Sequence, residues 1–328
     1  MPDVLRIGTR GSPLARTQAA MVGAAIRERH PHLEVTLVTI ETLGDRRRDV
    51  PLSALGSPGV FVKEIQRALQ QGQIDVAVHS AKDLPSFQPD DLMLAAFPAR
   101  EDPRDVVVLP QGREGPAAAA LAEGASAGAV LELLPPGAVV GTSSVRRRAV
   151  LARNFPHLKT EPIRGNLDTR LKKLAAGEYD AIILAASGLK RLGLASLPLA
   201  YFDVTEMIPA VAQGALAVEV RRDDEQAAAW VRSINDEATE KAVLAERAFL
   251  SVMGGTCAVP LGALAQVEGD QITMTTFAAD PKGEPFLTAG GSGPAGEAEK
   301  LGRSLGEQLW AAGGREILAA HTSGPGTD

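Results

Sequence analysis

Short β-type runs alternate with helical segments through the first two-thirds of the chain. Strands are expected at residues 6–8, 33–40, 75–79, 106–109, 139–141, 159–163 and 181–185, and helices at 14–29, 60–71, 144–153 and 167–176. Ser12 and Pro13 mark the start of the first helix, because serine is a favoured N-cap and proline a favoured first helical residue. The alternation predicts mostly parallel sheets covered by helices, and 328 residues are enough for two or three domains.

The last third of the chain has a different pattern. A helix is expected at residues 240–250, where Ala242, Ala245 and Phe249 share one face. Three strands follow at 261–267, 271–278 and 285–289, separated by turn residues, and a closing helix carries leucines at four-residue spacing. This pattern predicts a smaller α+β domain with a three-stranded antiparallel sheet.

Two segments are expected to lie outside the folded core. Residues 111–130 are rich in alanine and glycine, and this composition predicts a surface loop or a frayed helix. The tail at 321–328 is predicted to be disordered, as chain ends with small and polar residues often are.

The composition argues against several classes of protein. A formal charge of −6 and only 4% aromatic residues do not favour binding to nucleic acid or to anionic membranes. The five histidines show no metal-ligand spacing beyond the weak pair His30 and His32, so no metal site is predicted. Apolar runs are too short to span a membrane, the first residues do not read as a secretory signal, and there is a single cysteine. These features predict a cytoplasmic protein.

Polar and basic residues follow several of the predicted strands. They are Thr9 to Ser12, His79 to Asp83, Thr142 to Arg147, and Arg164 to Asn166. Ligands of open α/β sheets bind at the carboxyl ends of the strands, where helix N-termini and arginines favour anions. The sequence therefore predicts a polyanion cleft between two α/β domains. As an alternative, Ser12, Ser80 and Ser144 are only helix caps.

Asp83 and Cys257 do not fit a simple anion site. An acid among Arg10, Lys82 and Arg147 would repel a polycarboxylate, so Asp83 either forms a surface pair with Lys82 or stabilises positive charge and moves protons. Cys257 cannot form an internal disulfide. It is either an inert, half-buried side chain or a reactive thiol displayed on the glycine-containing loop 254–260.

Nine segments of the chain, taken together, resemble porphobilinogen deaminases, also called hydroxymethylbilane synthases. They are IGTRGSPLA (7–15), FVKE (61–64), VHSAKDLP (78–85), REDPRD (100–105), GTSSVRR (141–147), RGNLDTRL (164–171), GLKRLG (188–193), PAVAQGA (209–215) and GGTCAVP (254–260). They occur in the order of that family and cover nearly the whole chain.

The resemblance implies a three-domain α/β fold. Two doubly wound domains, similar to those of periplasmic binding proteins, would comprise residues 1–100 with 212–233 and residues 104–209. Residues 237–320 would form the α+β domain that carries the cofactor.

The resemblance also implies the chemistry. Members of the family join four porphobilinogen molecules head to tail into hydroxymethylbilane, release ammonia, and serve tetrapyrrole biosynthesis. Their cofactor is a covalent dipyrromethane, one per chain, attached by a thioether at the position of Cys257. The resemblance further suggests the next pathway enzyme as a partner for product hand-off. A monomer is expected because nothing in the sequence indicates an obligate interface, and the charge predicts no nucleic-acid or membrane partner.

Site residues follow from the matching motifs. Asp83 corresponds to the catalytic acid. The expected cofactor and substrate contacts are Arg10, Ser12, Gln18, Phe61, Ser80, Lys82, Thr142, Ser143, Ser144, Arg146, Arg147, Arg164, Asn166, Arg170, Arg191 and Gln213. Phe61 either packs on a pyrrole ring or belongs to the core.

Two departures and two rival functions accompany this interpretation. The loop at 53–60 lacks the lysines common in the family, and the 111–130 insertion is longer than usual. A non-enzymatic receptor for a small anion would explain the two α/β halves, but not Asp83 or the displayed thiol. A cysteine hydrolase would require a general-base histidine, and His79, the only histidine in a motif, ends a strand expected to be buried.

Overall fold

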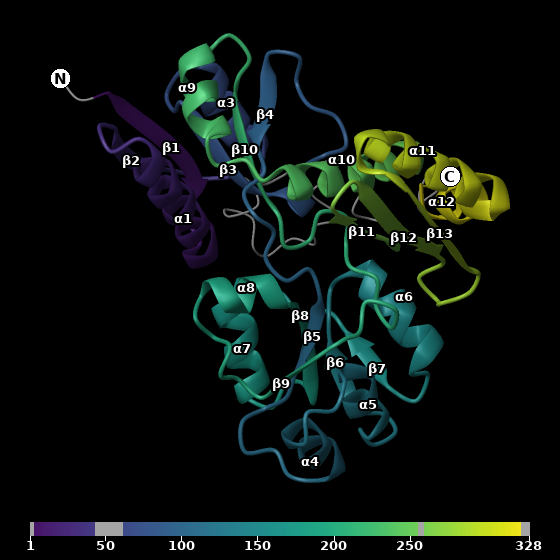
Figure 1. Cartoon of the computed structure of the whole chain (residues 1–328). Helices are drawn as coiled ribbons and strands as arrows, with labels where there is room; N and C mark the ends of the chain where they lie inside the picture. Colours follow the sequence, from purple (N-terminus) through teal and green to yellow (C-terminus); the bar gives the residue numbers. More distant parts are fainter. Residues whose placement is uncertain (1–2, 43–61, 255–258, 323–328) are drawn as a thin grey trace, which may run out of the picture.

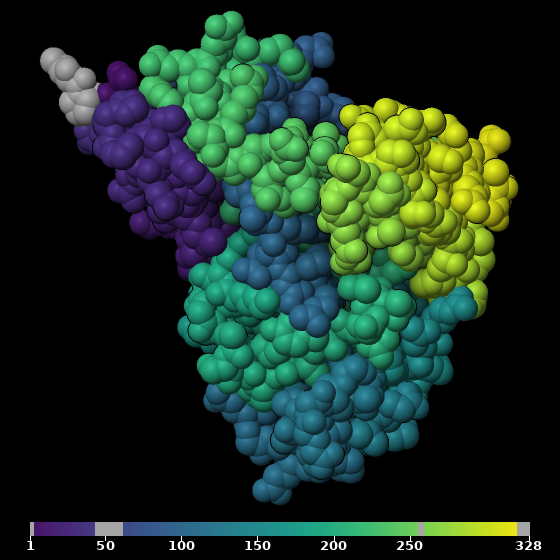
Figure 2. Space-filling model, viewed as in Figure 1, coloured from purple at the N-terminus to yellow at the C-terminus, as the bar shows by residue number. Residues whose placement is uncertain are grey.

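The computed structural model describes residues 3–42, 62–254 and 259–322. The predicted site residues Phe61 and Cys257, and the loop at 53–60, lie outside these ranges. Figure 2 shows three lobes: the first sheet with its helices at the top, the second at the bottom, and the C-terminal part at the right. None of the helices in the described ranges combines the length and the hydropathy needed to cross a bilayer.

The first lobe is a five-stranded mixed sheet in the order β2-β1-β3-β10-β4. Its strands are β1 (Val4–Arg10), β2 (Glu34–Ile40), β3 (Val76–Ser80), β4 (Leu92–Ala96) and β10 (Leu216–Arg221). β10 alone runs antiparallel to its neighbours. Alternate residues of β3 face opposite sides: Val76 and Val78 pack against α1 (Pro13–Arg29) and α9 (Glu225–Arg232), and Ala77 packs against α3 (Lys63–Gln70).

The second lobe repeats this arrangement with the order β7-β6-β8-β5-β9. Its strands are β5 (Asp105–Val108), β6 (Val139–Gly141), β7 (Lys159–Glu161), β8 (Ala181–Ala185) and β9 (Leu199–Tyr201), and β5 is the antiparallel strand. Helix α6 (Val145–Asn154) covers one face, while α7 (Leu167–Ala175) and α8 (Ala186–Arg191) cover the other. The prediction of mostly parallel sheets is confirmed, with one reversed strand in each.

The expectation of a surface loop or a frayed helix at 111–130 is wrong. The segment contains α4 (Pro116–Ala122) and the start of α5 (Ala127–Glu132), and Ala127 and Val130 are fully buried against the second sheet. Ala127, Val130, Leu131 and Leu134 follow helical spacing, so they form one apolar stripe. The alanine- and glycine-rich composition obscured this periodicity.

The C-terminal lobe is the predicted three-stranded antiparallel sheet. Strands β11 (Leu261–Glu268), β12 (Gln271–Ala279) and β13 (Phe286–Pro294) form a meander, and α10 (Glu237–Val252) and α11 (Ala298–Leu309) pack on it. The face shared by Ala242, Ala245 and Phe249 is buried, as predicted. Helix α12 (Arg315–Thr322) includes the first two residues of the predicted disordered tail, and 323–328 lie outside the described ranges.

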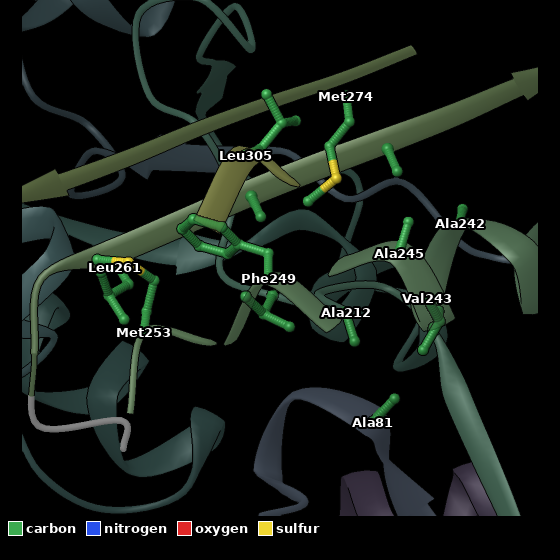
Figure 3. Close-up of a cluster of buried hydrophobic side chains, with 14 of the residues drawn as sticks. Ala81, Ala212, Ala242, Val243, Ala245, Phe249, Met253, Leu261, Met274 and Leu305 are labelled. Carbon is green, nitrogen blue, oxygen red and sulfur yellow. The ribbon is translucent and has the colours of Figure 1, made fainter. Parts of the chain in front are cut away.

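The core of the C-terminal lobe extends into the first lobe. Figure 3 shows Ala81 and Ala212 beside the α10 residues Val243 and Phe249, and all four belong to one buried cluster. Ala81 begins η2 (Ala81–Asp83), the short turn that follows β3. The C-terminal lobe therefore supports the turn that carries Lys82 and Asp83.

A buried carboxylate joins the lobes beneath this turn. Glu246 on α10 is fully buried and receives hydrogen bonds from Arg100 Nη1 at 2.6 Å and from the backbone N–H groups of Ala212 and Ala265. Arg100 also donates through Nε to the carbonyl of Gln213 at 2.8 Å. Arg100 lies in the first segment that connects the two α/β lobes, and Ala212 and Gln213 lie in the second. Glu246 and Ala265 belong to the C-terminal lobe, so this ion pair and its hydrogen bonds join all three lobes.

Glu246→Ala should lower the free energy of unfolding by about 3–5 kcal/mol, because it leaves the Arg100 guanidinium buried without its counter-charge. Urea denaturation followed by tryptophan fluorescence measures the change. The matched control is Glu237→Ala on the same helix. The side chain of Glu237 is 83% exposed beside Lys241, so its loss should cost about 0–1 kcal/mol. Equal effects of the two substitutions would contradict the assignment.

Candidate active site

A cavity of about 840 Å³ lies between the two α/β lobes. The first lobe contributes the ends of β1 and β3 and the start of α1, and the second contributes residues 163–170 and 184–192. The cavity thus has the position expected for a ligand site at the carboxyl ends of strands.

The cavity brings together twelve of the predicted site residues. They are Arg10, Ser12, Gln18, Ser80, Lys82, Asp83, Ser143, Arg147, Arg164, Asn166, Arg170 and Arg191. The predicted contacts Thr142, Ser144, Arg146 and Gln213 are not among its lining residues. Phe61 and Cys257 lie outside the described ranges.

Basic side chains dominate the cavity wall. Seven of the lining residues are basic (Arg10, Lys82, Arg147, Arg164, Arg170, Lys173 and Arg191) and three are acidic (Glu41, Asp83 and Asp168). The chain as a whole has a formal charge of −6. Positive charge is therefore concentrated in this cavity, as a polycarboxylate ligand requires.

Arg146 and Arg147 hold a buried carboxylate rather than extending freely into the cavity. Arg146 Nη2 lies 2.6 Å from Asp105 Oδ2, and Arg147 Nη2 lies 2.7 Å from Asp105 Oδ1. Burial alone would raise the pKa of Asp105, but the two guanidinium groups outweigh it and hold this pKa at about 2. Arg146 also donates to the Ile208 carbonyl at 2.8 Å, so both hydrogen bonds of this side chain are made within the protein.

Gln213 lies beneath the cavity and supports Lys82. Its Nε2 donates to Asp105 Oδ1 at 2.9 Å and to the Pro103 carbonyl at 2.7 Å, and its Oε1 accepts a hydrogen bond from Lys82 Nζ at 3.2 Å. Burial, together with repulsion from the Arg147 guanidinium, lowers the pKa of Lys82 to about 8. The structure thus places Gln213 as a support for a cavity residue.

Asp83 is exposed at the end of η2, on the cavity wall. The turn is fixed from below, because Ala81 and Leu84 are buried in the hydrophobic cluster that includes Val243 and Phe249. Lys82 is half-buried beside it. A carboxylate presented in this way can face a cationic ligand atom while its backbone stays in place.

The hydroxyl residues have different roles. Ser12 and Ser144 cap α1 and α6 by accepting hydrogen bonds from Ala15 N and Arg147 N. Ser80 stands at the N-cap position of η2, but its side chain makes no capping hydrogen bond; its hydroxyl pairs with the Gln18 amide at 3.0 Å. The capping alternative therefore describes Ser12 and Ser144, but not Ser80. Ser143 donates to the Ile163 carbonyl at 2.7 Å, and Thr142 Oγ1 accepts from Ser144 N.

Arg170 and Arg191 carry charges that are poorly compensated. Burial lowers the pKa of Arg170 to about 10, and repulsion from Arg147 and Arg164 adds to the effect. Burial also lowers the pKa of Arg191, whose Nη2 donates to the Gly214 carbonyl at 2.6 Å. Bound carboxylates would relieve both effects, because an opposite charge stabilises the protonated guanidinium.

Some residues around the cavity were not singled out from the sequence. Glu41, Asp168, Lys173 and Ser187 line it, Asp105 neutralises the arginines beneath it, and Glu246 joins the lobes.

Glu246 had a sequence signal: it lies four residues after Ala242, on the face expected to be buried. A buried carboxylate requires partners, so this spacing was a signal from which an ion pair could have been inferred. Among the described residues, no cluster of histidine, cysteine or acidic side chains is suited to a metal.

Comparisons with known proteins extend over nearly all of the chain. The family model described as porphobilinogen deaminase, dipyromethane cofactor binding domain, matches residues 5–229, and the model of the porphobilinogen deaminase C-terminal domain matches residues 240–311. The porphobilinogen deaminase of Geotalea uraniireducens is 46% identical over 315 residues, which cover 96% of this chain and 94% of that protein. The porphobilinogen deaminase of Chromobacterium violaceum is 43% identical over 323 residues, which cover 98% of this chain and 99% of that protein.

Among solved structures, the effector-binding domain of BenM with benzoate has a TM-score of 0.41 and 16% identity. The match covers 77% of this chain and 95% of that domain.

Proposed function

The chain belongs to the porphobilinogen deaminase family, and from that premise we propose which of its residues bind cofactor and substrate and which one acts in catalysis. The enzyme has porphobilinogen deaminase activity with a dipyrromethane cofactor and acts in tetrapyrrole biosynthesis. Four porphobilinogen molecules are joined head to tail into hydroxymethylbilane, and ammonia is released.

The residues that line the cavity fit a polycarboxylate. We assign Arg10, Lys82, Arg164, Arg170 and Arg191, with the cavity side of Arg147, to binding the acetate and propionate groups of cofactor and substrate. The observation that supports this most strongly is the concentration of seven basic side chains in one cavity of an acidic protein. Buried guanidiniums with lowered pKa values bind carboxylates with a net gain, because each charge-assisted hydrogen bond is worth roughly 1.5–3 kcal/mol.

Asp83 is the proposed catalytic acid. When bound through Cys257, the dipyrromethane supplies the pyrrole ring to which substrate units are added. Loss of ammonia from porphobilinogen leaves positive charge on the substrate, and the exposed Asp83 carboxylate can stabilise that charge and then accept a proton. Arg146 and Gln213 do not contact the ligand in this assignment. Both bind Asp105, which in turn holds Arg147, and Gln213 also accepts a hydrogen bond from Lys82.

We also propose the domain division expected from the sequence. Residues 1–100 with 212–233 would form one domain, 104–209 the second, and 237–320 the third. The order β3-β10-β4 supports the discontinuous first domain, because β10 returns to its sheet after the second lobe is complete. We retain the proposals of a monomer, which light scattering checks, and of a cytoplasmic enzyme, which cell fractionation checks.

Lys82 provides the test of the carboxylate-binding assignment. Its pKa of about 8 means that the free enzyme loses this charge above pH 8, and kcat/KM reports ionisations of the free enzyme. We expect kcat/KM for porphobilinogen to fall about 10-fold between pH 7.5 and 9.5, the value of one charge-assisted contact. Lys82→Arg should flatten this decline, because arginine stays charged.

The matched control for this test is Lys300→Arg, at an exposed position of α11 whose side chain is 77% accessible. This variant should show the decline of the parent enzyme. An identical decline in Lys82→Arg, or a flat profile in the parent, would contradict a binding role for Lys82.

A further inference from the structure

A small recess opens beside Asp83 and is shared with the main cavity. It has a volume of about 30 Å³ and is lined by Arg10, Ala15, Gln18, Val62, Ile65, Val78, His79, Ser80 and Asp83. Arg10, Gln18, Ser80 and Asp83 also line the main cavity, so the two spaces adjoin at the proposed catalytic acid. A cavity that holds one water molecule needs a volume of at least roughly 10–15 Å³ and two to four polar partners. The recess therefore has the size and the polar groups to hold a water.

His79 brings a buried ion-pair partner to this recess. Its side chain is 2% exposed, and its Nε2 lies 2.9 Å from Oε2 of the fully buried Glu219. In the β3–β10 register, His79 pairs with Ala217 and Glu219 pairs with Ala77, so the two side chains are diagonal neighbours on one face of the sheet. Because Nε2 contacts Glu219, Nδ1 is the ring nitrogen left for a second hydrogen bond, and His79 lines the recess.

Two further groups, from α3 and α10, act on Glu219. Gln66 from α3 donates to Glu219 Oε1 at 2.9 Å and carries no charge, and Arg247 from α10 acts on Glu219 as a cation. Arg10 and Asp83 face the recess from β1 and η2. A fully buried carboxylate requires partners, and the His79 ring is a third one for Glu219, in direct contact with it. Among the residues that line the two cavities, His79 is the only histidine.

We propose that His79 is a positioning and relay residue that exchanges a proton with Asp83 through one water in this recess. The proposal rests on the assignment of Asp83 as the proton acceptor. After each condensation, the O–H bond of the Asp83 carboxyl breaks and its proton passes to the water. A proton of that water passes to Nδ1 of His79, and the imidazolium forms an ion pair with Glu219.

The relay restores the Asp83 carboxylate before the next substrate unit loses ammonia. Between additions the proton returns along the same path, through the water and the main cavity, to solvent or to the departing ammonia. No oxidant, reductant or additional reactant is required. A purely structural role for the network of His79, Glu219 and Gln66 would fix β3 to β10 and α3 equally well, so the test must separate the two roles.

Two variants separate them. His79→Gln keeps a donor for Glu219 but removes the proton acceptor. Ala15→Val leaves the His79–Glu219 pair untouched and fills the recess with two additional methyl groups. The matched control is Ala20→Val, on the exposed face of the same helix. A crystal structure of each holoenzyme shows whether the water is present, and kcat is measured in H₂O and D₂O across pH 5.5 to 8.5.

We expect one ordered water within hydrogen-bond distance of Asp83 and His79 in the parent and in Ala20→Val, and none in Ala15→Val. A group that acts directly as general acid or base contributes about 10²–10⁴-fold to the rate. A relay acts only through such a group, so we expect its loss to lower kcat by about 10-fold. Both His79→Gln and Ala15→Val should show that loss, together with a changed solvent isotope effect. The KM for porphobilinogen should not change.

Several results would overturn the relay. They are a dry recess in the parent, parent-like kcat in Ala15→Val with the water displaced, or a loss of kcat in His79→Gln alone. If His79→Gln fails to fold, Ala15→Val decides by itself. Asp83→Asn keeps the two proposals apart: full activity in that variant overturns the role of Asp83, whereas an inactive Asp83→Asn with parent-like Ala15→Val overturns only the relay.

Discussion

Asp83→Asn is expected to retain the dipyrromethane and to lose turnover by about 10²–10⁴-fold, the usual contribution of a general acid or base. Asparagine has the shape of aspartate but cannot carry negative charge or accept the proton. The backbone should not move, because Ala81 and Leu84 anchor the turn in the hydrophobic cluster. Assembly of the holoenzyme and catalysis should therefore separate in this variant.

Intact mass and steady-state kinetics measure the two properties on one preparation. The control is Asp90→Asn, which changes an exposed acid of the same connecting segment, outside the cavity. It should keep both the cofactor mass and the parent kcat. Normal turnover in Asp83→Asn would refute the catalytic assignment, and loss of the cofactor would show that Asp83 serves assembly instead.

Cys257→Ser is expected to abolish the holoenzyme altogether, because the chain has no other thiol to anchor the cofactor. A serine hydroxyl is a far weaker nucleophile than a thiolate under neutral conditions. The parent protein should carry the added mass of one dipyrromethane on the peptide that contains Cys257, and that peptide should give a coloured Ehrlich reaction. The variant should have the unmodified mass and no activity.

Incubation with porphobilinogen makes this test decisive. Apoprotein of the parent should acquire the adduct, whereas Cys257→Ser should not, and the neighbouring Thr256→Ser should behave as the parent does. A receptor for small anions would bind porphobilinogen reversibly and gain no mass. An adduct on the serine variant, or on a different peptide of the parent, would refute Cys257 as the attachment point.

Local rules predicted the elements well. Ser12 and Pro13 started α1 where capping preferences placed it, and Ala242, Ala245 and Phe249 marked the buried face of α10. These features depend on residues a few positions apart. The reversal of β10 depends instead on pairing with strands more than a hundred residues away, and that of β5 on strands more than seventy residues away. No short pattern contains that information.

The sequence motifs predicted many of the cavity-lining residues but not the buried partners that orient them. Motifs placed Arg164, Arg170 and Arg191 on the cavity wall. In the run of three arginines at 146–148, the sequence could not say which guanidinium faces inward. That choice is made by Asp105, which binds both Arg146 and Arg147 from a strand forty residues earlier. A buried partner of this kind becomes visible only when the sheet is assembled.

The strand order β3-β10-β4 has a consequence for synthesis on the ribosome. β4 joins the first sheet only through β10, which emerges after the whole of the second lobe has been made. The second lobe, encoded without interruption, is thus the first that a translating ribosome can deliver complete. Until then the nascent N-terminal part holds Leu92 and its neighbours without their native partner strand, at the stage when chaperones act on growing chains.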